Sequence, residues 1–134
     1  MTGKYTLGKE ERLKNNLSIQ QLLKHGMVIS RFPLKLFWNY SPDPQQHFPV
    51  RAAISVPKRK FRKAVGRNLM KRRLREAYRL NKPVLYETLE QQQQKIQMVI
   101  LLLSDEFIPY ARMEREVREI IRLLTNKLSK TPLP

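Results

Sequence analysis

The chain has 134 residues, with 27 Lys and Arg residues against 11 Asp and Glu residues, so its formal net charge is +16 at pH 7. This length suits one domain with one hydrophobic core, and we expect residues 1–134 to form it, with a frayed tail from about residue 129. The absence of cysteine excludes disulfides, Cys-ligated zinc sites and thiol catalysis.

The sequence indicates neither a membrane span nor a secretory signal. The longest aliphatic run, Met98–Leu103, is far shorter than the roughly 20 apolar residues that a membrane helix needs. The N-terminal residues contain no apolar signal segment. We therefore expect a cytoplasmic protein without membrane contact.

The positive charge is concentrated in one segment. Residues 58–82 contain twelve basic residues and one acid, Glu76, whereas residues 83–134 carry equal numbers of both signs. A focused basic segment predicts a polyanionic partner, with nucleic acid ahead of anionic lipid.

The N-terminal part predicts short helical turns over residues 9–25. Ser18 is the expected N-cap of the second part, Ile19–His25. Gly26 follows as a glycine that can adopt the left-handed conformation beyond the helix end.

Two strands are predicted next. Apolar and polar side chains alternate over Leu34–Tyr40, and Val28–Arg31 is either a short strand or a loop entry. The second strand is Arg51–Val56. The proline-rich segment Ser41–Pro49 between them is expected to be an exposed loop.

The basic segment reads as a helix over Lys63–Leu80, which Pro83 should end near Asn81. Val84–Gln94 then forms a separate helical piece. The continuous apolar run Met98–Leu103 indicates a strand that is buried on both faces.

A final helix carries Pro109 in its first turn and an apolar stripe, namely Met113, Val117, Ile120 and Leu124. The order of elements predicts an α+β fold, a two-layer sandwich in which helices pack on one sheet.

No self-sufficient active site is predicted. His25 and His47 have no nearby acid or nucleophile, and Asp105 and Glu106 precede a helix whose dipole they offset. The four glycines form no phosphate-binding motif. We expect no catalytic residue and no metal site in the protein.

The predicted basic helix has two different sides. Its apolar side is Met70, Leu74 and Ala77, and its polar side is Asn68, Lys71, Arg72, Arg75 and Arg79. Like charges four residues apart are unfavourable on an isolated helix. A phosphate partner would offset this cost, and Arg grips phosphates with a planar fork.

The segment Lys63–Arg79, KAVGRNLMKRRLREAYR, resembles the signature of the bacterial ribonuclease P protein component, approximately AVxRNRxKRxxRE. Leu69 stands where that signature has its second arginine. The matching residues are Ala64, Val65, Arg67, Asn68, Lys71, Arg72, Arg75 and Glu76.

The resemblance implies a helper in an endoribonuclease whose catalytic subunit is RNA. That RNA removes the 5′ leader from precursor tRNA, and Mg2+ is expected to be bound mainly by the RNA. One monomeric protein would join one RNA in the ribonucleoprotein. The implied fold resembles the second domain of ribosomal protein S5, a mixed sheet with a left-handed βαβ crossover. The residues implied to dock on the catalytic RNA are Arg67, Asn68, Lys71, Arg72 and Arg75.

The resemblance also implies a cleft for the single-stranded leader, between the sheet and the N-terminal helix. Phe37 matches an aromatic position of that cleft, and Lys35, Arg51 and Ser55 share its side of the strands. Ile19 and Leu23 occupy positions where many members carry aromatics.

The alternative is a ribosomal-type structural RNA-binding protein, or a DNA-binding protein, that uses the same helix without a nuclease role. A helix-turn-helix needs a short turn before its recognition helix, whereas here a strand and Pro57 come first. A membrane-surface helix would need a large aromatic face, which the basic helix of this chain lacks.

Overall fold

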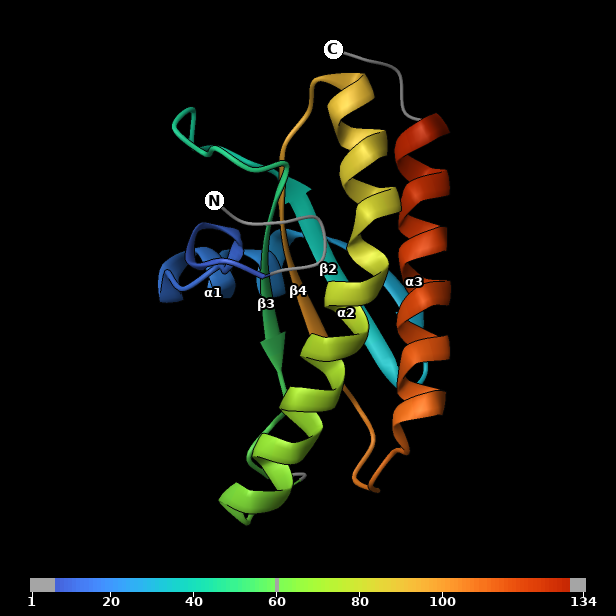
Figure 1. Ribbon diagram of the computed structural model, residues 1–134. Coiled ribbons are helices and arrows are strands. Elements are labelled where there is room, and N and C mark those ends of the chain that lie inside the picture. Colours follow the sequence, from blue (N-terminus) through green and yellow to red (C-terminus); the bar gives the residue numbers. More distant parts are fainter. Residues whose placement is uncertain (1–6, 60, 131–134) are drawn as a thin grey trace.

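The computed structural model describes residues 7–59 and 61–130. In this part of the chain, four strands form one mixed sheet in the order β1-β2-β4-β3 (Figure 1). β2 pairs antiparallel with β1 and β4, and β3 pairs parallel with β4. The strands are β1 (Met27–Arg31), β2 (Leu34–Tyr40), β3 (Val50–Ser55) and β4 (Ile96–Leu102).

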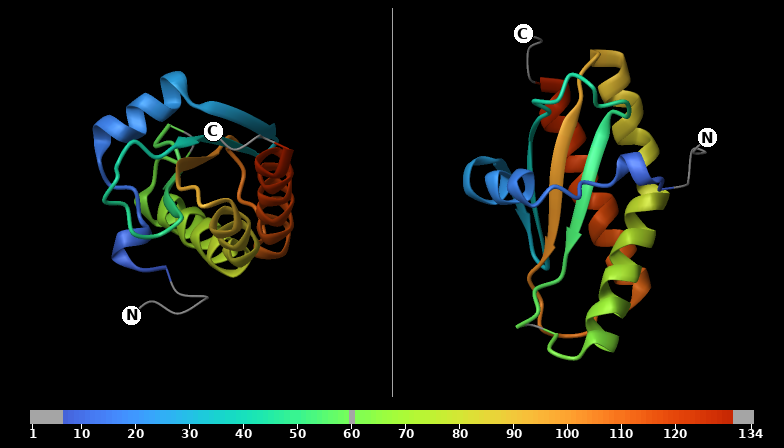
Figure 2. Two further views of the ribbon diagram at one scale, coloured as in Figure 1. Left: turned by 90° about the horizontal axis from the view of Figure 1, so that it is seen from above. Right: turned by 90° about the vertical axis from the view of Figure 1, so that its left-hand side faces the viewer.

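The helices lie on both faces of this sheet. The long helices α2 (Ala64–Gln92) and α3 (Tyr110–Lys130) cover one face, and α1 (Asn16–His25) lies on the other (Figures 1 and 2). A short turn of 3-10 helix, η1 (Lys9–Glu11), precedes α1. The predicted α+β fold with one mixed sheet is confirmed. α2 forms the crossover between the parallel strands β3 and β4, and its left-handed sense stays a prediction.

Two hydrophobic clusters result from the alternation of side chains along β2. Leu36 points into the main core between the sheet, α2 and α3, whereas Phe37 points to the opposite face. There Phe37 forms a smaller cluster with Leu13, Leu22 and Val99. This cluster holds α1 on the sheet.

The ends of α1 differ from the prediction. Asn15 is the N-cap instead of Ser18, and its Oδ1 accepts hydrogen bonds from the N–H groups of Leu17 at 2.9 Å and Ser18 at 3.2 Å. Gly26 is extended, with φ −69° and ψ 159°, so no left-handed residue ends the helix. A Cβ at Gly26 would lie 2.6 Å from the Leu22 carbonyl oxygen, so close packing requires the glycine.

Helix α2 continues through Pro83, which corrects the prediction of two separate helices. Proline removes one backbone donor and usually kinks or ends a helix. Here residues on both sides of it are buried, including Tyr78, Leu85 and Leu89, and α2 packs along α3. Burial of one continuous apolar side offsets the lost hydrogen bond.

The other elements lie close to their predicted positions. β4 is almost entirely buried, and the whole predicted stripe of α3 is buried. α3 begins at Tyr110, and the carbonyl of Pro109 accepts from the N–H of Met113 at 3.0 Å. Ser129 and Lys130 belong to α3, and the rest of the predicted frayed tail lies outside the described residues. No helix in residues 7–59 and 61–130 is long and apolar enough to cross a membrane.

Candidate nucleic-acid interface

The exposed side of α2 carries the predicted RNA-docking residues. Asn68, Arg72 and Arg75 are exposed and Lys71 is half-buried. The three apolar positions of the opposite side, Met70, Leu74 and Ala77, are all 0% exposed. The amphipathic reading of this helix is therefore confirmed, and its polar side faces solvent.

Not every arginine of the basic segment is directed to solvent. Nη1 of Arg67 donates to the carbonyls of Phe61 at 3.1 Å and Arg62 at 3.5 Å, and so holds the loop before α2. Nη1 of Arg73 donates to the Ile108 carbonyl at 2.6 Å. Arg67 thus has a bracing role that sequence reasoning missed, because a carbonyl acceptor leaves no signal in the pattern of side chains.

The α1 face of the sheet carries the predicted leader-cleft residues in three rows across β3, β4 and β2. The middle row is apolar and lies in the cluster beneath α1, so Phe37 is only 7% exposed. Nζ of Lys35 lies 5.4 Å from the centroid of the Phe37 ring. The first row is Arg51, Gln97 and Asn39. The middle row is Ala53, Val99 and Phe37, and the third row is Ser55, Leu101 and Lys35.

Residues 7–15, here called the N-terminal strap, cross β3 on the way to α1 (Figure 2). The N–H of Leu13 donates to the Ala52 carbonyl at 2.9 Å, and Arg12 forms a parallel bridge with Ala52. The strap places the side chains of Arg12 and Lys14 beside the α1 face of the sheet.

A buried ion pair anchors the strap to α2. The carboxylate of Glu11 accepts from Lys82, from the hydroxyl of Tyr86 at 2.6 Å and from the N–H of Gly8 at 2.7 Å. Burial raises the pKa of Glu11, but the hydrogen bonds from Lys82, Tyr86 and Gly8 outweigh it and hold this pKa below its ordinary value. Burial also raises the pKa of Tyr86, which therefore stays a hydrogen-bond donor.

Two cavities flank the strap. One of about 390 Å³ lies between Arg12, Lys14, Ile19 and Arg75, over apolar residues of β3. The other, of about 660 Å³, includes Arg12, Lys14 and Arg51. The fold thus brings Ile19 and Arg51 to the edges of these cavities, whereas Leu23, which is 42% exposed, and Ser55 line neither.

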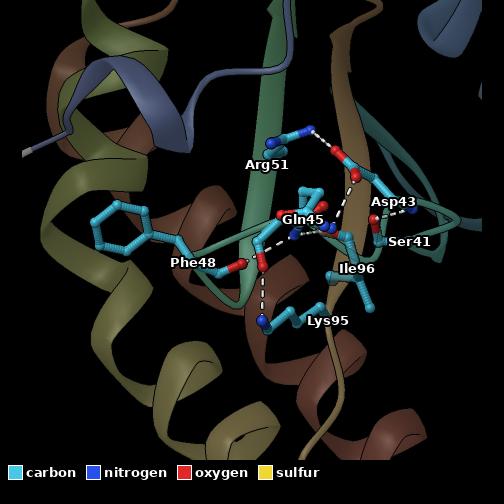
Figure 3. A network of polar contacts seen from close by, with 8 residues as sticks. Ser41, Asp43, Gln45, Phe48, Arg51, Lys95 and Ile96 are labelled. Carbon is cyan, nitrogen blue, oxygen red and sulfur yellow. Dashed lines mark hydrogen bonds and ion pairs between the residues drawn. The ribbon is translucent and has the colours of Figure 1, made fainter.

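The loop Ser41–Pro49 is exposed in part, as predicted, but polar contacts tie it to β3 and β4 (Figure 3). Its Gln46 is buried, and Nε2 of Gln46 donates to the Ile96 carbonyl at 3.0 Å. Asp43 accepts from Arg51 at 2.9 Å. The N–H of Gln45 and the Arg51 guanidinium together lower the pKa of Asp43. Arg51 therefore reaches the larger cavity as one member of an ion pair.

The described residues contain no group of three or more acidic or histidine side chains that could hold a metal ion.

A basic α+β domain whose basic helix side lies next to cavities lined by Arg and Lys is typical of a nucleic-acid-binding protein. Residues 7–125 match the model of the family described as Ribonuclease P. The chain therefore belongs to the Ribonuclease P family.

Similarity to curated relatives extends over most of the chain. The chain is 33% identical over 123 residues to a ribonuclease P protein component of Porphyromonas gingivalis, and the match covers 91% of this chain and 89% of the relative. It is 29% identical over 134 residues to that of Chlorobaculum tepidum, covering 93% and 87%.

Solved structures share the fold. The ribonuclease P protein of Staphylococcus aureus matches with a TM-score of 0.67 at 17% identity, over 85% of this chain and 94% of that one. That of Thermotoga maritima matches with a TM-score of 0.66 at 21% identity, over 84% and 96%.

Proposed function

We propose that this chain, a subunit of ribonuclease P in tRNA processing, binds the catalytic RNA through α2 and the 5′ leader of precursor tRNA on the α1 face of the sheet. One observation carries the proposal: the basic side of α2 and the basic cavity beside the N-terminal strap meet at Arg75. This residue belongs to the exposed side of α2 and also lines the 390 Å³ cavity, where the described lining has three basic side chains and no carboxylate.

The physical role of the protein is electrostatic. Two RNAs repel each other, and a phosphate contact from Arg or Lys releases condensed counterions when the RNA binds. Arg72 and Arg75 are exposed for such contacts, and their planar forks suit phosphate oxygens. In this proposal the RNA carries out the cleavage and binds the Mg2+. The protein contributes binding of the RNAs and no catalytic ion.

The leader would lie along the row of Ser55, Leu101 and Lys35 and the cavities beside the strap. Ile19 and Leu23 are aliphatic, so they add apolar contact instead of base stacking, which contributes about 1–3 kcal/mol per base. We therefore assign affinity for the leader mainly to Lys35 and to the basic residues of the strap.

Cleavage of a leader-bearing precursor tRNA by a bacterial ribonuclease P RNA at low Mg2+ tests the function. The chain should increase the cleavage rate, with saturation at one protein per RNA. Arg72→Gln should require more protein for the same rate. Arg115→Gln removes an equal charge from the exposed side of α3 and serves as the matched control. No increase in rate with the wild-type chain would overturn the proposal in favour of a structural RNA-binding role.

Leader binding is tested by comparing affinities for precursor and mature tRNA in the holoenzyme. Lys35→Ala should weaken binding of the precursor more than of the mature tRNA. Phe37→Ala tests the aromatic position in the same way, but this buried ring also supports the fold, and its loss costs about 3–5 kcal/mol. Lys35→Ala is therefore the cleaner variant, and an equal loss on both RNAs contradicts the cleft assignment.

A further inference from the structure

An exposed aromatic ring lies at the N-terminal end of α2, outside the residues assigned so far. Phe107 is 59% exposed, in the loop between β4 and α3. This loop and the loop before α2 lie together at the lower end of the molecule in Figure 1. Single exposed apolar side chains are common on protein surfaces, so the neighbours of Phe107 decide whether it marks a binding site.

The ring contacts two neighbours, Phe61 and Gly66. It packs edge-to-face on the buried ring of Phe61, with centroids 5.2 Å apart and an interplanar angle of 65°. A Cβ on Gly66 would lie 2.9 Å from Cζ of Phe107, so a side chain at this position would displace the ring from where it packs against the first turn of α2. Phe61, Gly66 and Phe107 are called the aromatic corner below.

The backbone next to the ring is fixed to α2. The Ile108 carbonyl accepts from Arg73 at 2.6 Å, and the Ile108 N–H donates to Sδ of Met70 at 3.5 Å. Arg67 holds the Phe61 carbonyl on the other side of the aromatic corner. A rigid ring loses little conformational entropy when it binds.

The surroundings of the aromatic corner are mainly basic. Asp105 and Glu106 are exposed directly before Phe107 in the chain. Four exposed basic residues outnumber them in the segment before α2, namely Lys58, Arg59, Arg62 and Lys63. An exposed, fixed aromatic ring among cationic side chains suits an unpaired base whose phosphates the cations bind.

We propose that Phe107 stacks on an unpaired base of the RNA that docks on α2. The inference rests on the proposed function and adds to it a base contact beyond the phosphate contacts of the helix. Leu69 replaces the second arginine of the family signature, and it packs partly buried against the main core. Stacking at the aromatic corner would give this chain affinity that Leu69 does not provide.

Affinity for a bacterial ribonuclease P RNA, measured at several salt concentrations, tests the proposal. Phe107→Ala and Phe107→Leu should both bind roughly 5- to 100-fold more weakly, whereas Phe107→Tyr keeps a ring and should bind as the wild-type chain does. Stacking releases no counterions, so the salt slope should not change. Phe32→Leu, which alters a phenylalanine that is 66% exposed in the turn between β1 and β2, is the matched control.

The leucine variant separates stacking from simple cover of Phe61, because leucine keeps an apolar side chain over that ring. Wild-type affinity of Phe107→Leu, or an equal loss in Phe32→Leu, would overturn the proposal while the proposed function stands. If the wild-type chain binds the ribonuclease P RNA no better than an unrelated structured RNA of equal length, the proposed function fails and this inference falls with it.

Discussion

Replacement of Lys82 by methionine tests whether the buried ion pair anchors the N-terminal strap. The side chains of Lys82 and Glu11 are 2% and 1% exposed, so removal of the ammonium leaves a carboxylate without its countercharge in a site shielded from water. Loss of one partner of a buried pair costs about 3–5 kcal/mol of unfolding free energy. A domain has about 5–15 kcal/mol in total, so Lys82→Met should lose a large part of its stability.

Denaturant unfolding followed by the fluorescence of Trp38 measures this loss, because Trp38 is the only tryptophan and is 3% exposed. Arg118→Met is the control, since it breaks an exposed pair in which Arg118 lies 3.0 Å from Glu114. Such a pair contributes about 0.2–1 kcal/mol.

A double variant isolates the interaction between the two charges. Glu11→Gln combined with Lys82→Met removes both charges and keeps an oxygen that can accept from Tyr86. Its loss of unfolding free energy should be smaller than the sum of the two single losses by about 0.5–3 kcal/mol. Strictly additive losses, or a loss in Lys82→Met no larger than in Arg118→Met, would refute the reasoning.

The remaining predictions concern acid stability, salt dependence and close packing. Because the pKa of Glu11 is held below its ordinary value of 4.5, the stabilisation that its carboxylate gives the fold is complete above pH 4.5 and is lost as the pH falls further. Glu11→Gln should flatten this part of the curve of stability against pH. An unchanged curve contradicts the assignment. Arg72→Ala should lower the salt slope of RNA binding by about one unit at an unchanged unfolding midpoint. Arg67→Ala should also lower that midpoint, because Arg67 holds the loop before α2; equal midpoints for both variants argue against this bracing role. Gly26→Ala should cost about 1–3 kcal/mol, measured by denaturant unfolding, since its Cβ would meet the Leu22 carbonyl; wild-type stability would show that the backbone moves aside.

Much of the local structure was predictable because the pattern of apolar and polar residues along a segment indicates which element it forms. Alternation over Leu34–Tyr40 predicted β2 with the observed bounds, and the apolar run near Met98–Leu103 predicted a strand buried on both faces. The signature in α2 predicted the family, which the match over residues 7–125 confirms. These signals depend on neighbouring residues, so no knowledge of the chain path is needed.

One error arose where a distant contact outweighs a local preference. Pro83 predicts a helix end, yet packing against α3 keeps α2 continuous. A glycine at the end of α1 suggests a left-handed residue, yet Gly26 is extended, and glycine is required there because a Cβ would lie 2.6 Å from the Leu22 carbonyl oxygen of the same helix. At Pro83, burial between elements decides the geometry, whereas at Gly26 the backbone of α1 itself leaves no room for a side chain.

For this protein, the sequence by itself determined β2, β3 and β4, the two sides of α2, the family and the polyanionic partner, because amphipathic periods and focused charge are local properties. Only the tertiary structure decided which arginines brace loops and which face solvent. It also joined Glu11 to Lys82, 71 positions apart, and thereby placed the strap beside Arg75. Partners so far apart in the chain are set by the path of the backbone, and a sequence pattern contains no record of that path.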